Sequence, residues 1–81
     1  MEYRTEDVSV SVSFYPVDGV QICVRNWMDD DGWVEVVDSR FICESFWEAM
    51  FSALNNAGWE SEAIVGQLAE WGIFEPESEE A

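Results

Sequence analysis

The chain has 81 residues, of which 18 are Asp or Glu and three are Arg, and it contains neither Lys nor His. The length allows one domain, the 48% hydrophobic content is too high for an intrinsically disordered acidic chain, and a net charge of -15 provides no cationic surface for bare DNA or RNA. The missing His and Lys also remove the commonest general base, the Schiff-base amine and the imidazole metal ligand.

The first half of the chain predicts an antiparallel meander of three strands. Residues 7–15 alternate between apolar and polar side chains, which is typical of a half-buried strand. The side chains expected on its inner face are Val8, Val10, Val12 and Phe14. Turn residues follow at 16–19 and again at 29–32, where three Asp precede a Gly.

The second and third strands are expected over residues 20–28 and 33–37. In the third strand, alternation predicts that Val34 and Val36 face the core and that Val37 faces outward. Residues 40–43 stay open between a short fourth strand and the approach to a helix.

Two helices are expected in the second half. Ser45 and Glu48 have the spacing of a capping box, and Gly58 is a plausible stop for the helix that follows. A second helix is expected from about Ser61 to Gly72.

Three further expectations concern the end of the chain. Gly66, inside the second helix, is interpreted as a mark of close helix packing. Ile73 and Phe74 are expected to dock on the core, and residues 75–81 form an acidic, loose tail. The fold class is therefore α+β, with a three- or four-stranded antiparallel sheet packed on one face by two helices, in a single acidic domain over residues 1–81.

Cysteine usage and the termini indicate a cytoplasmic protein. Cys23 and Cys43 are too few for a disulfide scaffold and are expected to be reduced thiols, and without His they do not form a zinc site. The N-terminus lacks the pattern of a signal peptide, and no apolar run approaches membrane-spanning length. We therefore expect no cofactor, no metal and no membrane association.

The topology predicts where the acids gather. In a meander, Glu6 and Asp7 lie beside the turn at 29–31, and if the third strand runs directly into the first helix, Glu60 and Glu62 come to the same end. A genuine fourth strand would break up this group. Each acid alone is explained by the preference of carboxylates for turns and helix starts, but the excess over the charge of about 2–8 that solubility requires indicates a strongly basic partner.

The tryptophans divide into two groups. Trp27 and Trp33 flank the triple-Asp turn and are expected on the uncovered sheet face, where they either pair across the hairpin or anchor a partner. With Tyr15 and Val37 they would also suit a homodimer contact. The other three, Trp47, Trp59 and Trp71, are expected in the core or at the helix junction.

Motifs for catalysis and metal binding are weak. In a calcium loop aligned on Gly32, Trp27 would occupy the first ligand position and strands rather than helices would flank the loop, so a plain acidic hairpin turn is favoured. Paired carboxylates have no evident substrate cleft, and Ser and Cys have no His to activate them. We expect a protein that is not an enzyme.

In size, charge and compact α+β plan, residues 6–74 resemble the small acidic proteins that phages and mobile elements encode against host defences, among them anti-CRISPR and anti-restriction proteins that mimic DNA. The resemblance implies a non-enzymatic inhibitor, acting in the host cytoplasm, that occupies a DNA-binding groove of a defence complex such as a CRISPR effector. The residues expected at this contact are Asp29, Asp30, Asp31, Glu35, Glu6, Asp7, Glu60, Glu62, Trp27 and Trp33.

Two other functions stay open. An immunity or antitoxin protein that neutralises a basic nuclease would follow the same charge logic. A self-associating adaptor module would instead use the uncovered sheet face and form a homodimer.

Overall fold

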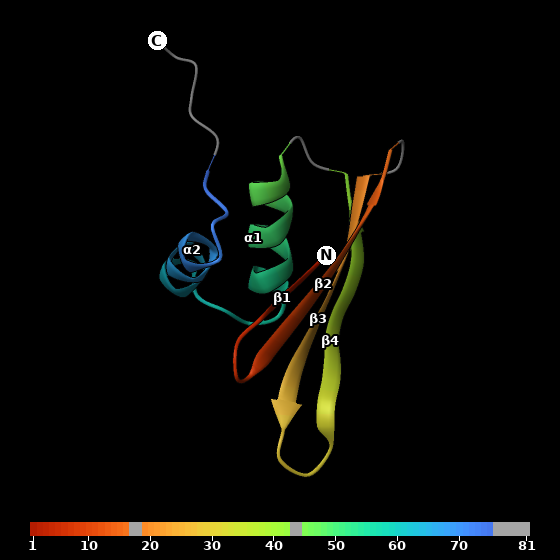
Figure 1. Ribbon diagram of the computed structural model, residues 1–81, viewed down its shortest axis with the longest axis vertical. Coiled ribbons are helices and arrows are strands. Elements are labelled where there is room, and N and C mark those ends of the chain that lie inside the picture. Colours follow the sequence, from red (N-terminus) through yellow and green to blue (C-terminus); the bar gives the residue numbers. More distant parts are fainter. Residues whose placement is uncertain (17–18, 43–44, 76–81) are drawn as a thin grey trace.

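The computed structural model describes residues 1–16, 19–42 and 45–75. It has an α+β fold in which a four-stranded antiparallel sheet, in the order β1-β2-β3-β4, carries both helices on one side and leaves the other side open (Figure 1). The strands are β1 (Glu2–Arg4), β2 (Val8–Tyr15), β3 (Gly19–Met28) and β4 (Gly32–Phe41), and the helices are α1 (Phe46–Asn56) and α2 (Ser61–Glu70).

The sheet gains its fourth strand at the N-terminus. β1 pairs antiparallel with β2, with Tyr3 opposite Val10, and the Val12 N–H donates to the Met1 carbonyl at 2.8 Å. Three residues are too few to show an alternating pattern, so no local sequence pattern predicts this strand. Arg40 and Phe41, the first two residues of the segment left open above, are the last residues of β4, and Cys43 lies outside the described residues.

A β-bulge in β4 reverses the predicted sides of Val36 and Val37. Val24 pairs with Val37 but the next residue, Arg25, pairs with Glu35, so Val36 is the extra residue on β4. Val37 is consequently buried in the core and Val36 is 43% exposed, the reverse of the prediction. One extra residue in β4 is accommodated in this way, and the two strands stay paired on both sides of the bulge.

α1 begins and ends where its sequence signals indicate. The Ser45 hydroxyl accepts a hydrogen bond from the Glu48 N–H at 3.1 Å, which caps the first turn. Met50 and Leu54 are fully buried against the sheet, and Gly58 follows the helix with a positive φ of 100°. α1 contacts β3 and β4 directly.

α2 packs against α1 and reaches the sheet through side chains. Ile64 and Leu68 are fully buried in the common core, and Trp71 stacks on Tyr3 of β1 with ring centroids 5.3 Å apart. Gly66 does not mark close packing, because nothing lies within 4 Å of a Cβ built there. Ile73 is buried as expected, whereas Phe74 is 70% exposed and does not dock on the core.

The remaining tryptophans lie where the sequence indicated. Trp47, Trp59 and Trp71 are partly buried and pack against the core cluster. Neither helix, at 11 and 10 residues, is long and apolar enough to cross a membrane; the finding covers the described part of the chain.

Candidate functional site

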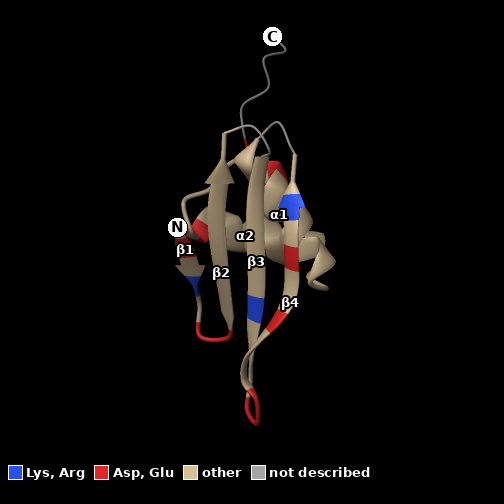
Figure 2. Cartoon of the chain, turned by 90° about the vertical axis from the view of Figure 1, so that its right-hand side faces the viewer, with Lys and Arg blue, Asp and Glu red and all other residues tan. Residues whose placement is uncertain are grey.

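The β3–β4 turn forms an acidic tip. Asp29, Asp30 and Asp31 are all exposed, and the Asp31 N–H closes the turn on the Met28 carbonyl at 3.1 Å. Figure 2 shows this turn projecting beyond the other strands at the lower end of the long axis. Three successive carboxylates are therefore presented to solvent at a protruding point of the molecule.

A second acidic turn, between β1 and β2, lies at the same end of the sheet (Figure 2). Glu6 and Asp7 are exposed, and the Trp27 N–H of β3 donates to the Asp7 carbonyl at 2.8 Å. The Thr5 hydroxyl accepts hydrogen bonds from the N–H groups of Asp7 and Val8, at 3.2 and 3.1 Å. These bonds hold the β1–β2 turn against the base of the hairpin and bring five expected contact residues to one end, the acidic end: Glu6, Asp7, Asp29, Asp30 and Asp31.

Glu60 and Glu62 do not join the acidic end. They lie at the start of α2, in the helical layer, well above the β3–β4 turn in Figure 1. The reason is length: at about 1.5 Å per residue in a helix and about 3.3 Å in a strand, α1 returns along only about half of β4. The predicted group of seven acids is therefore divided between two places.

Trp27 and Trp33 pair across the hairpin and also stay accessible. Their rings meet edge to face with centroids 5.4 Å apart, and they are 45% and 37% exposed. The Arg4 guanidinium lies 5.7 Å from the centroid of the Trp33 ring. The position of the pair at the base of the acidic tip is therefore compatible both with pairing across the hairpin and with anchoring a partner.

The open face of the sheet carries all three arginines of the chain. Because cross-strand partners project to the same side, the pairings of Arg4 with Ser9, Ser9 with Arg25 and Gln21 with Arg40 place the three arginines on the face opposite the helices. Figure 2 looks onto this face and shows all three in blue.

Among the residues that the structure describes in the strands, the acids on the open face match its arginines in number. Glu2, Glu35 and Asp38 share this side through the same cross-strand register. Arg4 pairs with Glu2 at 3.2 Å, and the Ser9 hydroxyl together with this guanidinium holds the pKa of Glu2 below its ordinary value. The described part of the open face is therefore charge-balanced, whereas the helical side, where α2 carries its acids, has no arginine.

The bulge brings together three groups that the sequence did not connect. Cys23 lies opposite Asp38, and the shift at Val36 brings Glu35 to the same side, so one ligand atom from each of the three lies within 4.8 Å of the others. Burial raises the pKa of the Cys23 thiol, and the neighbouring carboxylates of Glu35 and Asp38 raise it further. The doublet Val36-Val37, which interrupts the alternation, was the signal that could have revealed the bulge.

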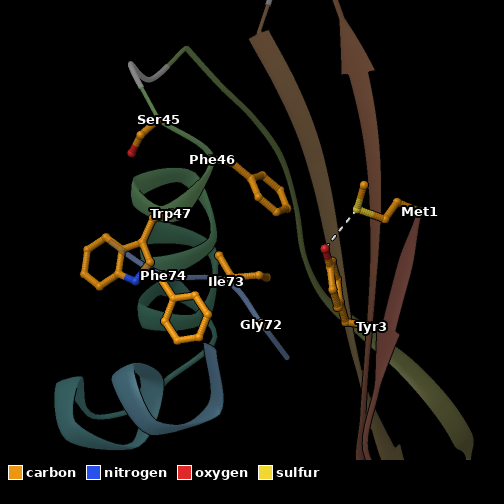
Figure 3. A pocket seen from close by; sticks show the side chains of 8 residues that line it. All are labelled: Met1, Tyr3, Ser45, Phe46, Trp47, Gly72, Ile73 and Phe74. Carbon is orange, nitrogen blue, oxygen red and sulfur yellow. Dashed lines mark hydrogen bonds between the residues drawn. The ribbon is translucent and has the colours of Figure 1, made fainter. Parts of the chain in front are cut away.

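A shallow apolar groove lies on the helical side, between the N-terminus, the start of α1 and the residues after α2 (Figure 3). Its volume is about 420 Å³, and aromatic rings of Tyr3, Phe46, Trp47 and Phe74 dominate its walls. Its two hydroxyls are engaged within the protein: that of Tyr3 donates to the Met1 sulfur at 3.0 Å, and that of Ser45 caps α1. The groove therefore offers apolar surface rather than an arrangement of nucleophile and base.

Comparison with protein-family models, with curated proteins and with solved structures finds no match to this chain.

Proposed function

We propose that this protein binds a basic, nucleic-acid-binding surface of another protein and blocks it by presenting carboxylates in place of phosphates. The observation that carries the proposal is the acidic end, where two hydrogen-bonded turns hold five exposed carboxylates together. Arginine pairs with a carboxylate in the same bidentate manner as with a phosphate, so a groove built for DNA or RNA also accepts such a surface.

The form of the acidic end supports insertion into a groove. The β3–β4 hairpin projects beyond β2 and is stiffened at its base by the Trp27–Trp33 pair. Because the carboxylates sit on tight turns, little conformational freedom is lost on binding. The exposed parts of the two indoles would supply apolar contact beside the charges.

We infer the kind of target from the resemblance in size, charge and α+β plan to anti-defence proteins. We propose a nucleic-acid-binding protein of a host defence system, such as a CRISPR effector complex, inhibited without catalysis by this protein. Inhibition would be competitive with the nucleic acid, and a net charge of -15 would steer association and make it fast at low salt.

The test is a pull-down from host lysate with the tagged protein, with duplex DNA or RNA as competitor, followed by titration of the captured target. Asp29, Asp30 and Asp31 are changed together to Asn. The matched control changes Glu60, Glu62 and Glu70 of α2 to Gln, which removes the same charge from the helical layer.

We expect the Asp→Asn triple variant to bind the target about tenfold to a thousandfold more weakly and the control to bind within a few-fold of the parent. Binding should also weaken at about 0.5 M salt, where the Debye length is a few Å. An equal loss of affinity in both triple variants would mean that binding depends on net charge and not on the acidic end. A captured target that nucleic acid does not displace would refute mimicry.

A further inference from the structure

The open sheet face differs from the rest of the protein in charge and in composition. It holds all three arginines and, among the described strand residues, three acids, with small serines between them on β2. It also exposes aromatic side chains: Tyr15, Trp27 and Trp33 are 38%, 45% and 37% exposed. A charge-balanced face with exposed aromatics, on a chain of charge -15, is the part of the described surface that another acidic protein could approach without strong repulsion.

We infer that this face is the interface of a homodimer, in which two copies pack their sheets face to face in opposite strand directions. The occupant is a second copy because the face is self-complementary: it provides both signs of charge, as an interface with twofold symmetry requires. This interface covers Trp27 and Trp33 but leaves the five carboxylates of the acidic end free, so the dimer contacts the target of the proposed function through its carboxylates and does not depend on that function.

The register specifies the pairing. On neighbouring rungs, Gln21 lies opposite Arg40, Cys23 opposite Asp38 and Arg25 opposite Glu35. We place a twofold axis between the two sheets, perpendicular to the strands and level with the Cys23–Asp38 pair. This axis sets the Gln21–Arg40 pair of one copy opposite the Arg25–Glu35 pair of the other. Arg40 of each copy then faces Glu35 of the other, so two identical ion pairs form across sheets that pack about 10 Å apart.

The same axis joins the aromatic groups. Only every second residue pair of the sheet faces the open side. Among these pairs, Trp27–Trp33 is the second from Cys23 in one direction, and Tyr15–Gly19 is the second in the other direction. Tyr15 of one copy therefore comes close to the tryptophan pair of the other. Buried aromatic clusters of this kind carry much of the binding energy in protein interfaces.

Charge also selects the direction of packing. With the axis across the strands, the two acidic ends lie at opposite ends of the dimer. An axis along the strands would bring the two triple-Asp turns side by side, where they repel. Pairing through the sheet edges is disfavoured as well, because β1 has three residues and β4 is interrupted by the bulge at Val36.

The bulge has a clear role in this arrangement. Glu35 and Arg40 are five residues apart in sequence and would point to opposite faces of a regular strand. The extra residue brings both to the open face at equal distance from the Cys23 rung. Without it, the reciprocal ion pairs could not form.

The experiment is sedimentation equilibrium of the full chain from micromolar to millimolar concentration at about 0.15 M salt. We expect a monomer–dimer equilibrium for the parent. Glu35→Arg and Arg40→Glu alone should each raise the dissociation constant about tenfold or more, since each reversal affects two pairs. The double swap, Glu35→Arg with Arg40→Glu, should restore most of the affinity.

Two matched variants separate this contact from net charge. Glu62→Arg makes the same change in charge as Glu35→Arg but on exposed α2, so it should leave the dimer unchanged or strengthen it. Asp38→Asn should strengthen the dimer, because Asp38 meets its own copy near the axis. Circular dichroism of each exposed-site variant shows that the fold is retained.

Salt distinguishes this contact from the proposed function. Added salt screens the repulsion between two chains of charge -15 and should strengthen the dimer, whereas it weakens binding to a basic target. A monomer at every concentration would overturn the inference. So would failure of the double swap to rescue, or a heterologous partner bound to this face in place of a second copy.

Discussion

Trp27 lies directly opposite Trp33 in the β3–β4 hairpin, and the two indole rings meet edge to face with centroids 5.4 Å apart. The pair sits where the hairpin leaves the sheet, and the Trp27 N–H also donates to the Asp7 carbonyl of the neighbouring turn. One residue thus joins the two acidic turns, through its backbone to one and through its ring to the other.

Replacing Trp27 with Ala should destabilise the protein by more than lost burial alone. Edge-to-face aromatic pairs contribute about 0.5–1.5 kcal/mol beyond burial, so the coupling between Trp27→Ala and Trp33→Ala should lie in that range. A double-mutant cycle from urea unfolding measures it. Additive effects of the two substitutions would mean that the rings touch without stabilising each other.

Two glycines should respond in opposite ways to substitution by Ala. Gly66 is exposed on α2 with nothing within 4 Å of an added Cβ, so Gly66→Ala should stabilise the protein by about 0.5–1 kcal/mol. At Gly19, φ is +98° and an added Cβ would meet the Phe41 carbonyl oxygen, so Gly19→Ala should destabilise it clearly. Thermal melts of the two variants provide the comparison, and a destabilised Gly66→Ala would reveal a contact that α2 makes elsewhere.

Local sequence signals predicted most of the fold. The alternation of β2, the turn residues after β3 and the cap at Ser45 each depend on near neighbours, and the structure has all three. β1 could not be predicted in the same way, because a three-residue edge strand is fixed by pairing with β2 rather than by its own pattern.

The arrangement of the candidate site depended on distances that no local pattern encodes. The sequence placed Glu6 and Asp7 beside the triple-Asp turn from meander topology alone, and Figure 2 shows both turns at one end. Glu60 and Glu62 do not join them. The topology predicts the direction in which α1 runs, but it does not predict that α1 covers only about half the length of β4. Glu35 lies on the open face as predicted, but the predicted sides of Val36 and Val37 are wrong, because the bulge changes the side of every residue beyond it.

The thiol of Cys23 should react slowly with alkylating reagents. Burial and the carboxylates of Glu35 and Asp38 raise its pKa above the ordinary value of 9.0, so less thiolate is present near pH 8 than in an unperturbed cysteine. Asp38→Asn and Glu35→Gln should each lower the pKa and speed the reaction. The rate of iodoacetamide labelling against pH, measured on dilute protein with Cys43→Ser, tests this.

The same pKa shift has a consequence for stability. A thiol whose pKa is raised on folding contributes fully to stability below pH 9.0, and that contribution is lost as the pH rises through the folded value. Urea unfolding of the parent should therefore show a decline above about pH 9 that Cys23→Ser reduces. An identical decline in the variant would assign it to other groups.

Added salt should raise the melting temperature of this protein. The net charge is -15 and all three arginines lie on the open face, so the carboxylates of the acidic end repel one another, and screening by salt weakens that repulsion. The triple variant of Asp29, Asp30 and Asp31 to Asn should melt several degrees higher than the parent at low salt and nearly with it at about 1 M salt. The matched Gln variant of Glu60, Glu62 and Glu70 should gain less, because Glu60 and Glu62 lie at the N-terminus of α2, where the helix dipole favours negative charge. Calorimetry at a series of salt concentrations measures both, and a melting point that stays flat or falls with salt would show that the acidic end is not under repulsion.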